Sequence, residues 1–316
     1  MGATPRPVTD ESECYNFNGF IVLNQRSRRI DGAVLNRFGF MAFLFLFALL
    51  VVLGCASPCR ARVMLSSSTP LDLGFRQMYN LQFEAAHRTF NEWERSHPDD
   101  PLGPTSDAAA YLFSELDRLG VLQMELFLDD DKFKRSKRLS PDPATRQAFD
   151  AALAKSEQVA DGVLSRSPRD GNALLAKIMD LGMRSDYLAL IDKRYLASLG
   201  YMKRAGILAD KLLAIDPSCY DAYLAGGVEN YILSLKPAPV RWLLRVYGAQ
   251  TDKDMGIDKL RLTAAKGHYL LPFAQLLLAV AALRDKNRDR ARDLLEGLAR
   301  EFPNNTLYRR ELERLH

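Results

Sequence analysis

The sequence of 316 residues predicts an all-α fold. Apolar residues recur at intervals of three and four from about Leu73 almost to the C-terminus, which is the spacing of one helix face. Prolines fall mostly at the ends or starts of these segments, as in Ser-His-Pro, Ser-Arg-Ser-Pro, Ile-Asp-Pro and Glu-Phe-Pro. A proline has no amide hydrogen and interrupts a helix. Since strand patterns are scarce, the sequence predicts stacked helices joined by tight turns.

An uncharged apolar segment precedes the helical region. Residues 38–59 contain no charged side chain, and Arg37 and Arg60 flank them. About 20 apolar residues cross a bilayer, so this segment is long enough for a transmembrane helix. Its apolar centre followed by small residues is also typical of a signal peptide. We therefore expect a membrane-inserting segment at 38–58, either as a permanent anchor or as a cleaved leader.

Cys55 offers a third form of attachment. The run Val52-Leu53-Gly54-Cys55 resembles the lipobox of bacterial lipoproteins. The resemblance implies that Cys55 carries the lipid and becomes the mature N-terminus, and more than one acyl chain would give stable attachment. The alternative is that Cys55 is a small apolar residue at the end of a hydrophobic helix.

The polar stretch 1–37 is longer than the leading region of an ordinary signal peptide. It is either a cytoplasmic tail or a stretch upstream of a start near Val34 or Leu35, and we favour the second. Its arginines slightly favour a cytoplasmic N-terminus, which would place the helical region on the periplasmic side. The expected domains are a tail at 1–37, an anchor or leader at 38–59, a linker at 60–72 and a helical domain at 73–316.

Thr69-Pro70 is a good start for the first helix, because Thr can cap it and Pro is tolerated at its first position. Further along, a small residue and a proline recur at one fixed spacing. Ala86, Ala205 and Ala291 each precede a proline by twelve residues. We expect the following small residues and prolines to form the packing positions of the repeats: Gly74, Ala86, Pro98, Ala205, Pro217, Gly227, Ala291 and Pro303.

This pattern resembles the tetratricopeptide repeat (TPR) family. The resemblance implies a solenoid of helical hairpins, in which the small residues let two helices cross closely and the proline ends the second helix. Trp93 departs from the family pattern, because a small residue normally stands there. Including Pro168, the closing prolines lie 70, 49 and 86 residues apart, so we expect an irregular array with inserted or degenerate hairpins.

A second resemblance covers residues 226–267. This segment is similar to one in bacterial envelope repeat proteins of unassigned role and, more distantly, in repeat proteins of the mitochondrial outer membrane. Asp252, Lys253, Gly256 and Ile257 stand at its characteristic turn.

Catalysis has little support in the sequence. The histidines are scattered, and no phosphate-binding loop or nucleophile motif is found. We expect a protein that is not an enzyme and that has no cofactor or metal. Cys219 is expected to be a small apolar filler. The net charge of +4 is too small to favour nucleic acid as the main partner.

A TPR-like solenoid implies a concave groove that binds a protein or peptide. The candidates for that groove are Asp221, Leu224, Val228 and Tyr231, although the three apolar ones equally suit a core. Our leading hypothesis is a membrane-anchored scaffold in a bacterial cell envelope. The alternatives are a spacer or accessory subunit of an envelope complex, and an enzyme whose site is assembled from distant helices. The charged stretch 129–138 is either a solvated connector or a contact to lipid headgroups or an acidic partner.

Overall fold

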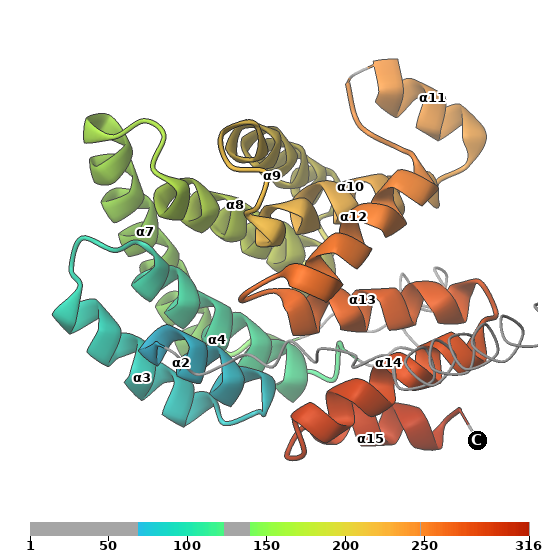
Figure 1. Ribbon diagram of the computed structural model, residues 1–316, viewed down its shortest axis with the longest axis horizontal. Helices are drawn as coiled ribbons and strands as arrows, with labels where there is room; N and C mark the ends of the chain where they lie inside the picture. The colour runs from blue at the N-terminus through green and yellow to red at the C-terminus, as the bar shows by residue number, and fades with distance from the viewer. Residues whose placement is uncertain (1–68, 123–139, 247, 316) are drawn as a thin grey trace, which may run out of the picture. The chain divides into compact units, whose positions relative to one another are not determined.

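A computed structural model describes residues 69–122, 140–246 and 248–315, and within these residues every regular element is helical (Figure 1). The prediction of an all-helical domain is confirmed for this part of the chain. The apolar segment 38–59, Cys55 and the charged stretch 129–138 lie outside the described residues. The helices are α2 (Pro70–Tyr79), α3 (Phe83–Ser96), α4 (Leu102–Arg118), α7 (Pro143–Arg166), α8 (Gly171–Asp186), α9 (Tyr195–Ile215), α10 (Tyr223–Ser234), α11 (Ala238–Val246), α12 (Lys253–Lys266), α13 (Leu271–Arg284), α14 (Arg288–Glu301) and α15 (Thr306–Glu313).

The start of α2 follows from its cap. The Thr69 hydroxyl accepts a hydrogen bond from the Asp72 amide at 3.2 Å, and the Asp72 carboxylate accepts one from the Thr69 amide at 2.9 Å. This reciprocal pair satisfies two amides that a helix start otherwise leaves free. The helix begins at Pro70, so the last residues of the expected 60–72 linker belong to it.

The helices pack as successive hairpins. The strongest pairings join α2 with α3, α4 with α7, α8 with α9, α10 with α12, and α13 with α14. We call the earlier helix of each pair its first helix and the later one its second helix. Close approach within the first hairpin requires Gly74, because a Cβ atom there would lie 2.2 Å from a ring carbon of Phe90.

Four hairpins end in the same turn. Pro98, Pro168, Pro217 and Pro303 each stand two residues after the last residue of α3, α7, α9 or α14. In all four turns the amide before the proline donates to the carbonyl four residues earlier at 2.8 Å. The carbonyl of the same residue before the proline accepts a hydrogen bond from the amide three residues further along the chain, at 3.0–3.2 Å. The closing prolines therefore mark equivalent positions in the structure.

The uneven proline spacing has a structural cause. The interval from Pro217 to Pro303 contains two hairpins, because α12 ends at Gly267 rather than at a proline. Helix α11 is also inserted between the two helices of the α10–α12 pair. The interval from Pro98 to Pro168 includes residues 123–139, which join α4 to α7.

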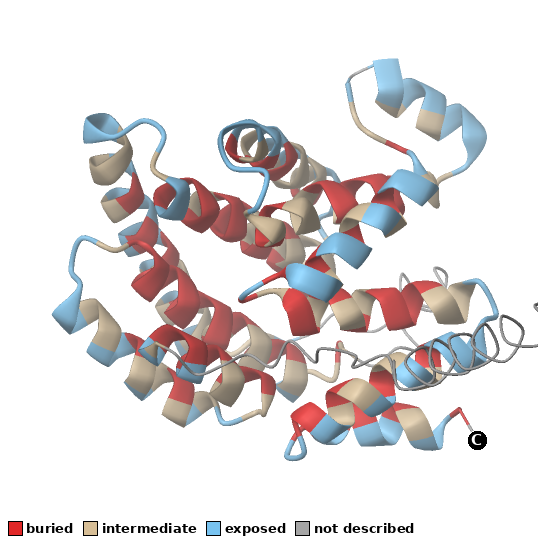
Figure 2. Ribbon diagram, in the orientation of Figure 1, coloured by how far each residue is buried: buried red, intermediate tan, exposed pale blue. Residues whose placement is uncertain are grey.

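The first and last hairpins meet through an inner seam of aromatic side chains, formed by Phe75, Tyr79, Tyr269 and Phe302. The Phe75 and Tyr269 rings stack with centroids 4.7 Å apart, and the Tyr79 hydroxyl donates to the Tyr269 carbonyl at 2.9 Å. The ring of Phe302 lies 5.6 Å from that of Tyr79. The four residues are buried, and they hold the blue first helix near the red last ones (Figures 1 and 2).

A second aromatic contact crosses the array. Phe113 of α4 and Phe273 of α13 meet edge to face, with ring centroids 5.5 Å apart. Both belong to first helices, which an open solenoid leaves facing a groove. The described residues thus form a closed array. Aromatic side chains from first helices therefore lie on the side where a concave groove is expected.

Candidate functional site

The residues expected to line a concave groove have structural roles. Asp221 is 3% exposed, and its carboxylate accepts the amides of His268 at 2.8 Å, Tyr269 at 2.9 Å and Leu270 at 3.1 Å. It therefore fixes the connection between α12 and α13. A buried carboxylate that accepts three amides is not accessible to a partner, so the structure does not place Asp221 in an open groove.

The other three expected groove residues belong to a small core between α10, α12 and α13. Tyr231 is buried in this core beside Leu260. Leu224 and Val228 are half-buried and pack against it. These three apolar residues therefore face α12 and α13, in agreement with the core role that was the alternative to a groove.

The small residues of the repeat pattern lie where helices touch. Ala86, Ala205 and Ala291 are buried. A Cβ atom on Gly227 would lie 3.0 Å from the side chain of Leu260 in α12. Cys219 is half-buried, and burial raises the pKa of its thiol to about 11, which makes it a poor nucleophile at neutral pH.

Two hollows lie elsewhere, each between consecutive second helices and with a first helix as its floor. The α4 groove has a volume of about 410 Å³ and lies between α3 and α7. The α8 groove has a volume of about 320 Å³ and lies between α7 and α9. The α4 groove is lined by Leu81, Phe83, Glu84, His87, Tyr111, Ser114 and Thr145, and the α8 groove by Glu157, Lys177, Asp180, Leu181, Arg184, Arg204, Ile207 and Leu208.

The α4 groove combines one lining carboxylate, Glu84, with the aromatic rings of His87 and Tyr111. His87 of α3 lies with its Nδ1 atom 2.5 Å from Oδ1 of Asp107 in α4, and both side chains are largely buried. The rings of His87 and Tyr111 lie with centroids 4.0 Å apart. Burial, together with the nearby Asp107 and Glu84, raises the pKa of Tyr111. The hydroxyl of Tyr111 therefore keeps its proton at neutral pH and can donate a hydrogen bond.

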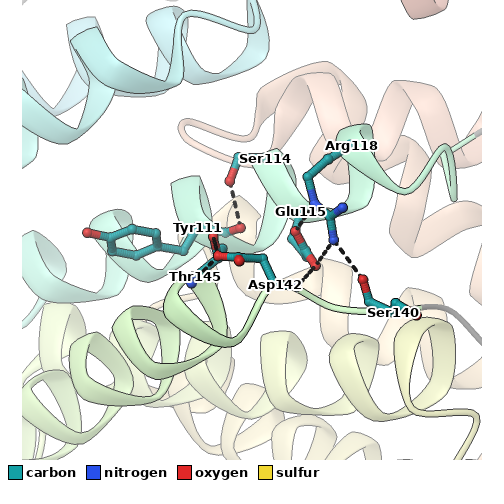
Figure 3. A network of polar contacts seen from close by, with 7 residues as sticks. All are labelled: Tyr111, Ser114, Glu115, Arg118, Ser140, Asp142 and Thr145. Carbon is teal, nitrogen blue, oxygen red and sulfur yellow. Dashed lines mark hydrogen bonds and ion pairs between the residues drawn. The ribbon is translucent and has the colours of Figure 1, made fainter.

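A polar network beside this groove fixes its walls (Figure 3). The Arg118 guanidinium binds both carboxylate oxygens of Glu115 at 2.7 Å and donates to the Ser140 carbonyl at 2.9 Å. Glu115 also accepts the Asp142 amide at 2.8 Å, and Asp142 caps α7 by accepting the Thr145 amide at 2.7 Å. The end of α4 is thereby joined to the start of α7, and Tyr111 and Thr145 are held on adjoining walls.

The α8 groove has a buried carboxyl group at its floor. Asp180 is 5% exposed; its Oδ2 accepts the Ser156 hydroxyl at 2.6 Å, and Ser156 lies 2.6 Å from the hydroxyl of Thr105. The other oxygen of Asp180 has no hydrogen-bond partner among the described residues. Burial raises the pKa of Asp180 to about 7.

The rim of the α8 groove is charged and partly apolar. Arg184 lies 3.6 Å from Glu157, and Lys177 pairs with Asp161. Arg204 and Ile207 come from α9, and Ile207 is 59% exposed. The groove therefore presents charges of both signs and apolar groups around a carboxyl group with a raised pKa.

No sequence motif connects the side chains of these two grooves, so they could not be predicted as sites from sequence. Tyr111 and Ser114 come from one helix, but His87 and Thr145 reach the same hollow from two others. Asp180 did leave a signal, since it is a lone acid within the apolar run of α8. Such a residue in a buried position requires a partner or a raised pKa.

Among the described residues, no helix combines the length and the apolarity needed to cross a bilayer, and the expected span at 38–58 lies outside those residues. No group of three or more His, Cys, Asp or Glu side chains in those residues is arranged to hold a metal ion.

The described part of the chain is a helical-hairpin repeat domain with a closed inner face. No family model matches the sequence, and no curated protein matches it. A solved structure of a thermophilic TPR protein from Thermus thermophilus is similar at 16% identity. The alignment covers 78% of this chain and 96% of that chain, with a TM-score of 0.42.

Proposed function

We propose that this protein is a membrane-anchored scaffold that binds a segment of a partner protein in the α4 and α8 grooves. The observation that supports the proposal is the pair of solvent-open hollows between consecutive second helices, together with an inner face that is already filled. A partner has access to these hollows without opening the array.

The chemistry of the two grooves differs, which specifies the partner. Glu84 and Tyr111 make the α4 groove suitable for a basic or aromatic side chain. Arg204 makes the α8 groove suitable for an acidic one, because Lys177 and Arg184 already have acidic neighbours. Because the two grooves share α7 as a wall, one polypeptide segment with both kinds of side chain fits them in succession. Walls that are already ordered reduce the entropy lost on binding.

The membrane part of the proposal rests on residues 38–59. An uncharged run of this length is expected to insert in a bilayer, and Cys55 is the expected lipid site if the leader is cleaved. Intact mass measurement of the membrane-extracted protein separates a chain that starts at Met1, near Val34 or at a lipid-modified Cys55. A soluble chain without any modification would contradict anchoring.

Site-specific photocrosslinking tests the groove proposal. A photoreactive residue at Ile207 should capture a defined partner, whereas one at Leu196, which is exposed on the same helix but outside the groove, should not. Arg204→Glu should then abolish capture from Ile207, because it reverses the charge of the rim. Equal capture at both positions, or capture that survives Arg204→Glu, would show that the groove is not the binding site. A rigid spacer, the rival function, predicts no specific capture at all.

A further inference from the structure

Helix α11 exposes its apolar side chains to solvent. None of its nine residues is buried, and Figures 1 and 2 show it standing apart from the neighbouring helices. Its exposed large apolar residues are Val240, Trp242, Leu243 and Val246, which are 43%, 67%, 49% and 63% exposed. Four neighbouring apolar side chains on one short helix form a patch that a folded protein ordinarily covers.

The polar side of α11 is held toward the rest of the domain. Arg241 donates to the carbonyls of Ser234 at 3.3 Å and Lys236 at 3.1 Å. Arg245 donates to the Thr251 hydroxyl at 2.6 Å. In a typical helix of this domain, such as α14, the apolar residues are the buried ones. The two arginines therefore maintain an orientation opposite to the usual one.

The charge around α11 has a single sign. From Asn230 to Thr251 the sequence contains Lys236, Arg241 and Arg245 and no acidic residue. A helix with Trp and Leu on one side and cations on the other is typical of segments that lie in the interface of a membrane. Each cation near an anionic bilayer adds to the attraction.

We propose that α11 lies in the headgroup region of an anionic lipid bilayer, with Trp242, Leu243 and Val246 inserted. A bilayer fits better than a protein partner because the patch projects from the domain, where a flat surface reaches it, and because the three charged residues of the segment 230–251 are all cationic. The inference uses the proposed function only in placing the chain at a membrane. It adds a second membrane contact, which is independent of the grooves and of residues 38–59.

The test uses tryptophan fluorescence of the full chain in vesicles. The chain has two tryptophans, Trp93 and Trp242, and Trp93 is stacked on His97 and donates to Asp100. In vesicles of phosphatidylcholine and phosphatidylglycerol with brominated acyl chains, the bromine should quench Trp242. The matched variant Trp242→Phe retains only Trp93 and should lose this quenching. Lys236→Gln should lower the ratio of inserted to free helix by about fivefold.

Three outcomes would overturn the proposal. The first is absence of quenching in the wild-type chain. The second is equal quenching in Trp242→Phe, which would assign the signal to Trp93. The third is a change of oligomeric state in Trp242→Phe without any lipid dependence, which would identify the patch as a protein contact. Groove capture from Ile207 is measured separately, so failure of the scaffold proposal leaves the fluorescence result unaffected.

Discussion

The inner seam and α11 are both rich in large apolar side chains, but only the seam is covered. In the seam, Tyr79 and Tyr269 lie 190 residues apart in sequence and are still in direct contact. In α11, Trp242 and Leu243 face solvent although their own helix is short and close to α10 and α12 in sequence. An apolar pattern in the sequence therefore indicates a face that needs to be buried, whereas the tertiary structure decides which surface covers that face. The seam should therefore govern stability, and α11 should not.

The largest effect is expected from Phe75→Ala in the seam. Phe75 is fully buried and contacts the rings of Phe90 and Tyr269. Removing a buried Phe ring costs about 3–5 kcal/mol, because packing is lost and a cavity remains. Urea unfolding measures this loss. The matched control is Leu73→Ala, on the exposed side of the same helix, which should change the unfolding free energy by less than about 1 kcal/mol. Similar losses in both variants would show that the seam is not a stabilising contact.

Asp221→Ala should have a somewhat smaller effect. The substitution leaves the amides of His268, Tyr269 and Leu270 without their acceptor, next to the seam. Each buried donor left unpaired costs about 1–3 kcal/mol, reduced where water enters, so we expect a loss of about 3 kcal/mol. The same urea titration measures it. Asp221→Asn keeps one acceptor oxygen and should lose less, and a larger loss in Asn than in Ala would contradict this role.

The ionisation of Asp180 should change the unfolding free energy by an intermediate amount. Burial raises the pKa of this carboxyl from its ordinary 3.8 to about 7 in the folded state. Between these two values the folded state holds the proton and the unfolded state does not, so rising pH favours unfolding. The contribution of protonated Asp180 to the stability of the folded state is complete below about pH 4. It falls between about pH 4 and pH 7 and is lost above about pH 7.

Comparison with Asp180→Asn isolates this carboxyl group. Since each unit of pH in that window corresponds to about 1.4 kcal/mol, the wild-type chain should lose about 2 kcal/mol more than the variant between about pH 5 and pH 7. The measurement is the unfolding free energy of both chains in urea at several pH values. Parallel curves for the two chains would show that Asp180 ionises normally and that the α8 groove has no buried carboxyl group of this kind.

Local features of the fold were predictable from sequence. The first helix starts at Thr69-Pro70 because its capping chemistry lies within four residues. The turns at Pro98 and Pro303 are equally local, and Ala86 and Ala291 stand at a fixed distance from them within one hairpin. A sequence pattern reports such features because the residues involved are neighbours in the chain or on one helix.

Features that depend on distant segments were not predictable. The inner seam joins the first hairpin to the last, and nothing in the period of the repeats indicates that the array closes. The same limit applies to the candidate site. Asp221 lies in the short helical turn Tyr220–Ala222 just before α10, and the chain that its carboxylate contacts follows α12. His87 and Thr145 share a hollow only because α4 and α7 are joined through Glu115.

The smallest effect on stability is expected from Leu243→Ser in α11. Leu243 is half exposed on a helix without a buried residue, so the loss in unfolding free energy should stay below about 1 kcal/mol. The same substitution should weaken bromolipid quenching of Trp242, because it removes apolar surface from the inserted side of the helix. Phe75→Ala in the seam should have the opposite effects, namely a large loss in unfolding free energy and no direct effect on lipid contact. If Leu243→Ser destabilised the fold as strongly as Phe75→Ala, α11 would be part of the core, and its exposed patch could not be a surface kept for a bilayer.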